Sequence, residues 1–168
     1  MTLQELNAFP RYRAEGELVK CCGSTAWVRT MTGRRPFASR DRLQRAASEV
    51  WWRLDPADWL EAFRAHPQIG QQRTVALTSV QAQAWSAEEQ SGMSRAGVGV
   101  TGALEEANQE YLAKFGYIFI VCAAGKSADQ MLSLLKSRLA NPPEAEIRVA
   151  AEEQDKITRL RLDRLVPL

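Results

Sequence analysis

The sequence predicts an all-α fold, arranged as a single compact multi-helix domain over residues 1–168. Three observations support this prediction: helix-start signals recur along nearly the whole chain, apolar residues follow them at helical spacing, and no internal repeat or linker interrupts the pattern. With 45% hydrophobic and 25% charged residues and a mean hydropathy of −0.32, the chain has the composition of a globular protein with one core.

Short helices are predicted at the start of the chain. Thr2 and Glu5 have capping-box spacing, in which each side chain bonds to the other residue's backbone N–H. Ser24 is a suitable N-cap for a further helix, which ends at the turn-prone Thr32 and Gly33.

The most regular helical pattern follows Ser39. Its apolar residues fall at i, i+3, i+4, i+7, i+8 and i+11 and so form a core-facing stripe: Leu43, Ala46, Ala47, Val50, Trp51 and Leu54. Asp55 and Pro56 then open another helix, with Asp55 as the N-cap and the proline in the first turn. Pro67 ends this helix, because a proline disfavours helix in the residue before it. One face of the helix carries Trp59, Ala62, Phe63 and His66.

The middle of the chain predicts two more helices and one ambiguous segment. Ser86 and Glu89 repeat the capping-box spacing and predict a helix N-terminus there. Thr101 precedes a helix that ends at Gly116. Residues 117–124 are apolar, and their periodicity leaves two interpretations open, a strand or a buried extended segment.

Two helices complete the chain. Ser127 and Gln130 cap the first of them, which ends before Asn141 and two prolines. The last helix is long. Because successive helical residues are about 100° apart, Arg161 shares its inward stripe and Arg159 points away. The other members of that stripe are Ile147, Ala150, Gln154 and Ile157.

Charge, cysteines and apolar runs limit the partners and the compartment. The 22 basic and 20 acidic residues give a net charge of +2, too small to predict a nucleic-acid partner. The longest apolar run, residues 115–125, is too short to span a membrane. Three cysteines, two of them adjacent as Cys21 and Cys22, do not describe a secreted disulfide framework. We therefore expect a cytoplasmic protein.

His66 is the only histidine, so a multi-histidine metal site is excluded and no structural metal is expected. With an ordinary pKa of about 6.5, an imidazole is the natural candidate for proton transfer near neutral pH. The alternative is structural, because a histidine at the end of a helix can simply bond to a backbone carbonyl.

Two other positions point to chemistry. Ser86, Glu89 and Gln90 would present an anion-binding helix N-terminus beside a carboxylate, although the same spacing serves capping alone. Arg161 places a guanidinium on an otherwise apolar stripe, which requires a buried partner to offset desolvation. An anionic ligand and an internal ion pair with Glu89 both satisfy that requirement.

Several short blocks of residues follow one another along nearly the whole chain. They are Cys21-Cys22-Gly23-Ser24 with Trp27, Arg35-Pro36-Phe37, Asp58-Trp59, His66-Pro67-Gln68-Ile69-Gly70, Ser86 to Glu89-Gln90, Lys114-Phe115-Gly116, Arg138-Leu139-Ala140-Asn141, and Lys156-Ile157-Thr158-Arg159-Leu160-Arg161-Leu162. Together these blocks resemble the 2-oxo-4-hydroxy-4-carboxy-5-ureidoimidazoline (OHCU) decarboxylase family of urate breakdown. No single block is sufficient, and residues 71–83 match no motif.

The resemblance implies an all-helical homodimer that converts a small-molecule substrate to (S)-allantoin and CO2 without a metal or organic cofactor. By motif position, His66 would be the acid/base group, Glu89 its partner, and Arg161 a clamp on an anionic or carbonyl edge. The substrate-binding residues would be Pro67, Ser86, Gln90, Phe119 and Ile120.

Two other function classes stay open. One is a lyase or hydrolase of a related small ureido or imidazole acid, which could use the same side chains. The other is a non-catalytic helical interaction module, in which the basic residues within 34–45 bind nucleic acid or an acidic protein.

Overall fold

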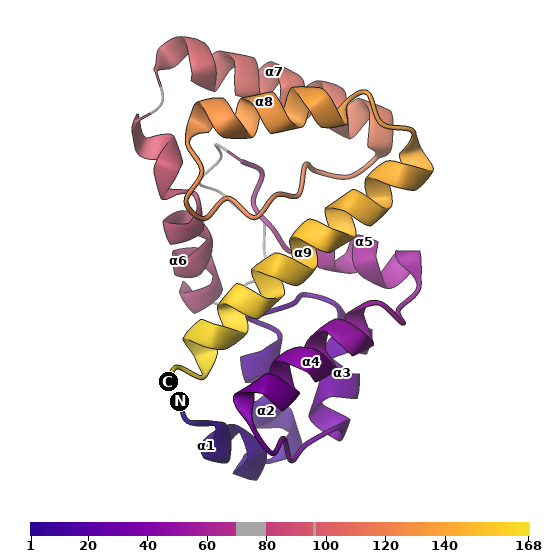
Figure 1. The fold of residues 1–168 in the computed structure, drawn as a ribbon, viewed down its shortest axis with the longest axis vertical. Coiled ribbons are helices and arrows are strands. Elements are labelled where there is room, and N and C mark those ends of the chain that lie inside the picture. Colours follow the sequence, from indigo (N-terminus) through magenta and orange to yellow (C-terminus); the bar gives the residue numbers. More distant parts are fainter. Residues whose placement is uncertain (70–79, 96) are drawn as a thin grey trace. The chain divides into compact units, whose positions relative to one another are not determined.

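The computed structural model describes residues 1–69, 80–95 and 97–168, and in these residues every regular element is helical (Figure 1). The predicted all-α fold class is confirmed. The chain divides into two compact units, residues 1–62 with 155–168, and residues 63–154. None of the helices in the described ranges is both long and apolar enough to cross a membrane.

The first unit is built from short capped helices. Thr2 forms the predicted capping box with Glu5, and the side chains of Ser24 and Ser39 accept from the backbone N–H groups of Trp27 and Arg42. Its elements are α1 (Leu3–Ala8), α2 (Arg11–Leu18), α3 (Thr25–Gly33), α4 (Arg40–Trp51), most of α5 (Pro56–Arg64) and the C-terminal end of α9 (Pro143–Leu165).

Tryptophans form much of the core of this unit. The Trp27 indole N–H donates to the carbonyl of Ala47 at 3.0 Å, and the Trp59 indole donates to the carbonyl of Trp51 at the same distance. The rings of Trp27, Trp51 and Trp59 are all buried. Because each donor has a partner, the large apolar area of these two indoles is buried without leaving a polar group unsatisfied.

The basic residues between 34 and 45 are largely engaged within the first unit. Arg35 donates to the carbonyls of Leu6 and Phe9 at 2.6 and 2.8 Å, at the C-terminal end of α1, where a cation is favoured. Arg34 pairs with Glu49, and Arg40 with Asp163. These contacts weaken the interpretation of this stretch as a nucleic-acid face.

The second unit packs α8 against α7 and against a short 3₁₀ helix. Its elements are the end of α5, α6 (Val80–Glu89), η1 (Ser91–Arg95), α7 (Val98–Phe115), α8 (Ala128–Arg138) and the start of α9. Between α7 and α8 the core contains the buried residues Leu104, Ala107, Tyr111, Met131 and Leu135. Ser127 and Gln130 form the predicted capping box of α8.

Two predicted helix starts are wrong. Ser86 and Glu89 lie in the last turn of α6 rather than at its N-terminus, and α7 begins at Val98, three residues before Thr101. The first error has a simple cause. A spacing of three residues places two side chains on one helix face anywhere along a helix, so the pattern does not distinguish a capping box from the interior.

The 117–123 segment links the two helices that form the core. Gly116 adopts a left-handed conformation with φ of 78° and ends α7 with its N–H on the carbonyl of Leu112. A residue with a side chain is strained at that φ, which accounts for the glycine. The segment itself is neither helix nor strand, although most of its residues are buried. The strand, which was one of the two interpretations of this segment, is therefore not formed.

Candidate active site

The 117–123 segment carries two predicted site residues and contacts the helix end that precedes His66. Phe119 and Ile120, both expected to bind substrate, are 1% and 2% exposed within it. The ring of Tyr117, where the segment begins, lies 5.4 Å from the ring of Phe63 in the last turn of α5. His66 follows that turn, and its backbone N–H donates to the carbonyl of Phe63 at 3.2 Å.

His66 and Pro67 are half-buried and lie just beyond the end of α5. The turn that carries them is anchored on both sides, because Phe63 is fully buried before it and Asn108 of α7 binds the backbone after it. The Nδ2 of Asn108 donates to the carbonyl of Ile69 at 3.1 Å. Sequence reasoning missed Asn108, which lies on the same face of α7 as the buried Leu104 and Tyr111.

The predicted cluster of Ser86, Glu89 and Gln90 is gathered at the C-terminal end of α6. Ser86 and Glu89 are each 7% exposed, and the N–H of Gln90 donates to the carbonyl of Ser86 at 3.1 Å. The expectation that helix N–H groups face a ligand here is wrong, since a C-terminal end presents carbonyls. A buried carboxylate is disfavoured by that end of the helix dipole, and such local conflicts are typical of functional positions.

Glu89 lies within electrostatic range of the far end of the 117–123 segment. Burial raises the pKa of the Cys122 thiol, and the carboxylates of Glu153 and Glu89 raise it further, against the opposing charge of Lys126. The end of α5 therefore contacts the segment at Tyr117, and the charge at the end of α6 acts on it at Cys122.

Arg161 belongs to the first unit, and its predicted inward orientation is confirmed. The side chain is 4% exposed, whereas Arg159 is exposed. Its Nη1 donates to the carbonyl of Lys20 at 3.3 Å. Burial raises the pKa of the Cys22 thiol to about 12, and the Arg161 charge acts in the opposite direction. The clamp role and the alternative pairing with Glu89 both stay predictions.

A separate cavity of about 270 Å³ lies in the second unit. Gln68 and Ile69 contribute to it, but the predicted catalytic and substrate-binding residues do not line it. Its remaining lining comes from η1 and α7, namely Met93, Thr101, Leu104, Glu105, Asn108 and Gln109. We therefore do not assign the chemistry to this cavity, despite its closeness in sequence to His66.

A family model for OHCU decarboxylase matches residues 7–163 of the chain. The chain belongs to the OHCU decarboxylase family. Among its relatives is the Arabidopsis thaliana uric acid degradation bifunctional protein TTL, 38% identical over 152 residues, which are 90% of this chain and 47% of that protein. The chain thus spans about half the length of this relative.

Two further family relatives match the chain along most of their own length. The 2-oxo-4-hydroxy-4-carboxy-5-ureidoimidazoline decarboxylase of Amia calva is 29% identical over 132 residues, covering 79% of this chain and 75% of that one. A crystal structure of OHCU decarboxylase in the presence of (S)-allantoin is 36% identical and superimposes with a TM-score of 0.77, covering 89% of this chain and 96% of that one.

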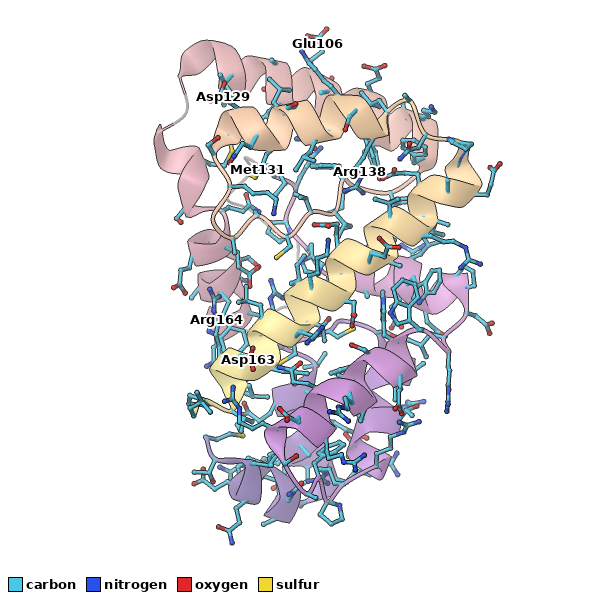
Figure 2. The ribbon with its side chains drawn as sticks, in the orientation of Figure 1. Glu106, Asp129, Met131, Arg138, Asp163 and Arg164 are labelled. Carbon is cyan, nitrogen blue, oxygen red and sulfur yellow. The ribbon has the colours of Figure 1, made fainter. Side chains whose placement is uncertain are left out.

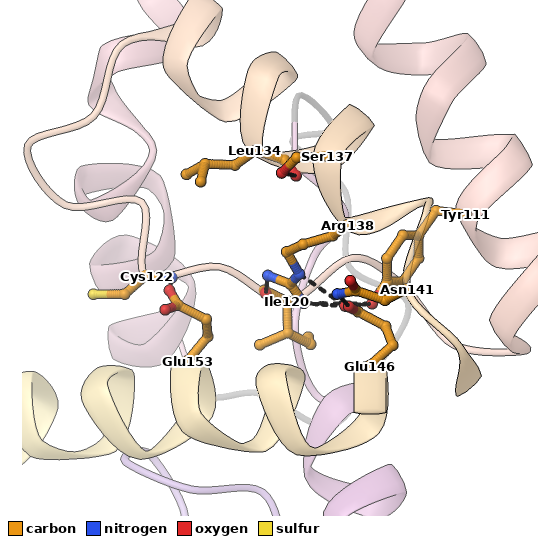
Figure 3. A network of polar contacts seen from close by, with 9 residues as sticks. All are labelled: Tyr111, Ile120, Cys122, Leu134, Ser137, Arg138, Asn141, Glu146 and Glu153. Atoms are coloured by element: carbon orange, nitrogen blue, oxygen red, sulfur yellow. Dashed lines mark hydrogen bonds and ion pairs between the residues drawn. The ribbon is translucent and has the colours of Figure 1, made fainter. Parts of the chain in front are cut away.

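A buried ionic network beside the segment was missed by sequence reasoning, although part of it lies in a block that resembles the family. Arg138 is 7% exposed and Glu146 is fully buried. The Arg138 Nε and Nη2 donate to Glu146 Oε1 at 2.7 and 2.5 Å, and the Tyr111 hydroxyl donates to the same oxygen. The Nδ2 of Asn141 donates to Oε2 at 2.7 Å (Figure 3).

The signal for this network was present in the sequence. Arg138 lies three residues after Leu135 and seven after Met131 on α8 (Figure 2), so it shares their buried stripe. The argument that selected Arg161, a guanidinium on an apolar face, applies equally to Arg138. Its partner Glu146 could not be identified in the same way, because it lies on a different helix.

Proposed function

We propose that the protein decarboxylates OHCU to (S)-allantoin and CO2 in urate breakdown. The observation that carries this proposal is the match of the OHCU decarboxylase family model to residues 7–163. The arrangement of the second unit supports it: the helix end that precedes His66 contacts the 117–123 segment through Phe63 and Tyr117, and the charge of the buried Glu89 acts on the Cys122 thiol of the same segment.

The substrate needs no external electron sink. Its carboxylate is attached to a ring carbon next to an imine, so the electron pair of the broken carbon–carbon bond moves into the ring and onto the imine nitrogen, which takes up a proton. The resulting enol gains a proton on the carbon that carries the ureido group and loses its hydroxyl proton. The ring carbonyl of allantoin forms in that step, with CO2 as the other product.

Control of the second protonation is the task that remains for the protein. The substrate can lose CO2 unaided, but free enol is protonated on both faces. One fixed donor delivers the proton to one face and so sets the S configuration. We assign that transfer to His66, with Glu89 tuning the imidazole. Positioned proton transfer typically contributes about 10²- to 10⁴-fold to a rate.

The backbone of the 117–123 segment is suited to bind a ureido compound. In the described part of the chain, no hydrogen bond engages the N–H or C=O of Phe119 or Val121, although both residues are buried. Such unpaired groups are costly unless a ligand or water satisfies them. Ureido groups and amide rings carry alternating donors and acceptors, as a paired strand does. Pro67, Ser86, Gln90 and Ile120 complete the proposed binding surface, and Arg161 binds an anionic or carbonyl edge.

His66→Ala tests the assignment. We expect this variant to keep the helical circular dichroism of the wild type but to no longer accelerate formation of (S)-allantoin. The assay follows the circular dichroism of allantoin after the protein is added to urate and the enzymes that oxidise it. Wild-type rates and stereochemistry in the variant would refute the role of His66.

We also propose that the chain works as a homodimer in the cytoplasm, as one domain over residues 1–168, without a metal or organic cofactor. The family resemblance supports the dimer, and the cysteine pattern supports a reducing compartment. Light scattering on the eluted protein tests the dimer. Activity after exhaustive dialysis against a chelator tests the absence of a metal requirement.

A further inference from the structure

The 117–123 segment is held by side chains rather than by a neighbouring strand. The Nη1 of Arg138 donates to the carbonyl of Ile120 at 2.7 Å. Two residues later, the N–H of Cys122 donates to Oε2 of Glu153 at 2.7 Å. Figure 3 shows Arg138 coming from α8 and Glu153 from α9, with Ile120 and Cys122 between them. Two helices thus supply the bonds that a sheet partner would normally supply.

Within the described ranges, these contacts bind the polar groups on one edge of the backbone. The Nζ of Lys126 donates to the carbonyl of Cys122 at 2.7 Å, so the bonded groups belong to Ile120 and Cys122. Phe119 and Val121 have no backbone hydrogen bond among the described residues. Extended backbone alternates its polar groups between two edges. The alternation therefore defines a satisfied edge, which α8 and α9 hold, whereas the groups on the other edge receive no bond from the residues that the structure describes.

The Arg138 contact is itself rigid. Two of its nitrogens bind the fully buried Glu146, and its guanidinium carbon lies 4.5 Å from the centre of the Phe119 ring. A planar guanidinium bonded at three nitrogens has little freedom to rotate. The same side chain therefore fixes the ring of Phe119 and the carbonyl of Ile120.

We propose that Arg138 and Glu153 are positioning residues of the decarboxylase: by holding the satisfied edge, they set the register in which the backbone groups of Phe119 and Val121 meet the substrate. This inference rests on the proposed function. A shift of the backbone by a fraction of a hydrogen-bond length changes both binding and alignment. The residues that hold such a segment then matter as much as those that contact the ligand.

Glu153 offers the sharper test, because it is only half-buried. Glu153→Met removes the acceptor for the Cys122 N–H with little change in length, whereas Glu153→Gln keeps a carbonyl oxygen in its place. We expect Glu153→Met to raise the KM for OHCU about tenfold, because the displaced backbone groups bind the substrate less tightly, and Glu153→Gln to stay within about twofold of the wild type. Glu152→Met, an exposed neighbour on the same helix, is the matched control and should leave KM unchanged.

KM separates positioning from mere loss of folded protein, since a smaller folded fraction lowers the apparent kcat and leaves KM unchanged. Equal KM values for the Met and Gln variants overturn the proposal. Should Glu153→Met fail to fold, Arg138→Lys decides: it keeps the charge beside Glu146 but lacks the fork that reaches Ile120, and an unchanged KM overturns the proposal. An inactive wild type would instead refute the proposed function itself.

Discussion

Removing one charge from the buried pair in the second unit should destabilise the protein far more than removing a surface charge. Glu146→Gln is nearly isosteric, so it creates no cavity and isolates the electrostatic contribution. Glu146 is fully buried and accepts from Arg138, Tyr111 and Asn141. Its neutralisation leaves the Arg138 cation buried without a counter-charge, a change that costs about 3–5 kcal/mol.

Urea unfolding followed by circular dichroism measures this cost. With a slope of about 2 kcal/mol per molar, the loss lowers the midpoint by about 1.5–2.5 M. The matched control is Glu15→Gln, which breaks the exposed pair between Arg11 and Glu15 and should cost about 0.3–0.5 kcal/mol. A midpoint for Glu146→Gln within about 0.5 M of the wild type, at unchanged slope, would show that the charge is not paired as described.

The double variant Arg138→Met with Glu146→Gln tests the reason for that loss. It removes the cation as well, so we expect it to be more stable than Glu146→Gln alone. The recovery should be partial, because the carbonyl of Ile120 then lacks its donor. A double variant as unstable as the sum of the two single ones would mean that the side chains do not interact.

Three further predictions concern single groups. Cys122 is half-exposed, whereas Cys21 and Cys22 are buried, so native protein should react with Ellman's reagent at one thiol. Burial raises the pKa of all three thiols, so this reaction should be slow and its rate should increase as the pH rises. Reaction of three thiols without unfolding would contradict the prediction. Burial also raises the pKa of Asp155 above 3.8, so the folded state holds this proton more tightly and the free energy of unfolding falls as pH increases from about 3.8 through the raised value. The Asp155→Asn variant lacks that fall. In thermal melts, its stability relative to the wild type should therefore be higher at pH 7 than at pH 3. Asn108→Leu leaves the carbonyl of Ile69 without its donor and should lower the free energy of unfolding in urea by about 1–3 kcal/mol. It should also lower the rate of decarboxylation, because this hydrogen bond holds the turn after α5.

Helical periodicity and caps could be predicted from the sequence because both are local. The stripe after Ser39, the capping box at Ser127 and the inward orientation of Arg161 depend only on residues within a few turns. The family resemblance likewise needed no coordinates, since it depends on the order and spacing of several short blocks.

Tertiary structure alone decided which residues from separate helices meet. Glu146 pairs with Arg138 across the junction between α8 and α9, and Glu89 acts on Cys122, thirty-three positions away in the sequence. The capping-box spacing at Ser86 was compatible with two positions in a helix, and packing placed it at the C-terminal end. The 117–123 segment shows the same limit. Its apolar residues predict burial, but whether it joins a sheet or is held by arginine and glutamate side chains depends on the surrounding elements, which no local pattern contains.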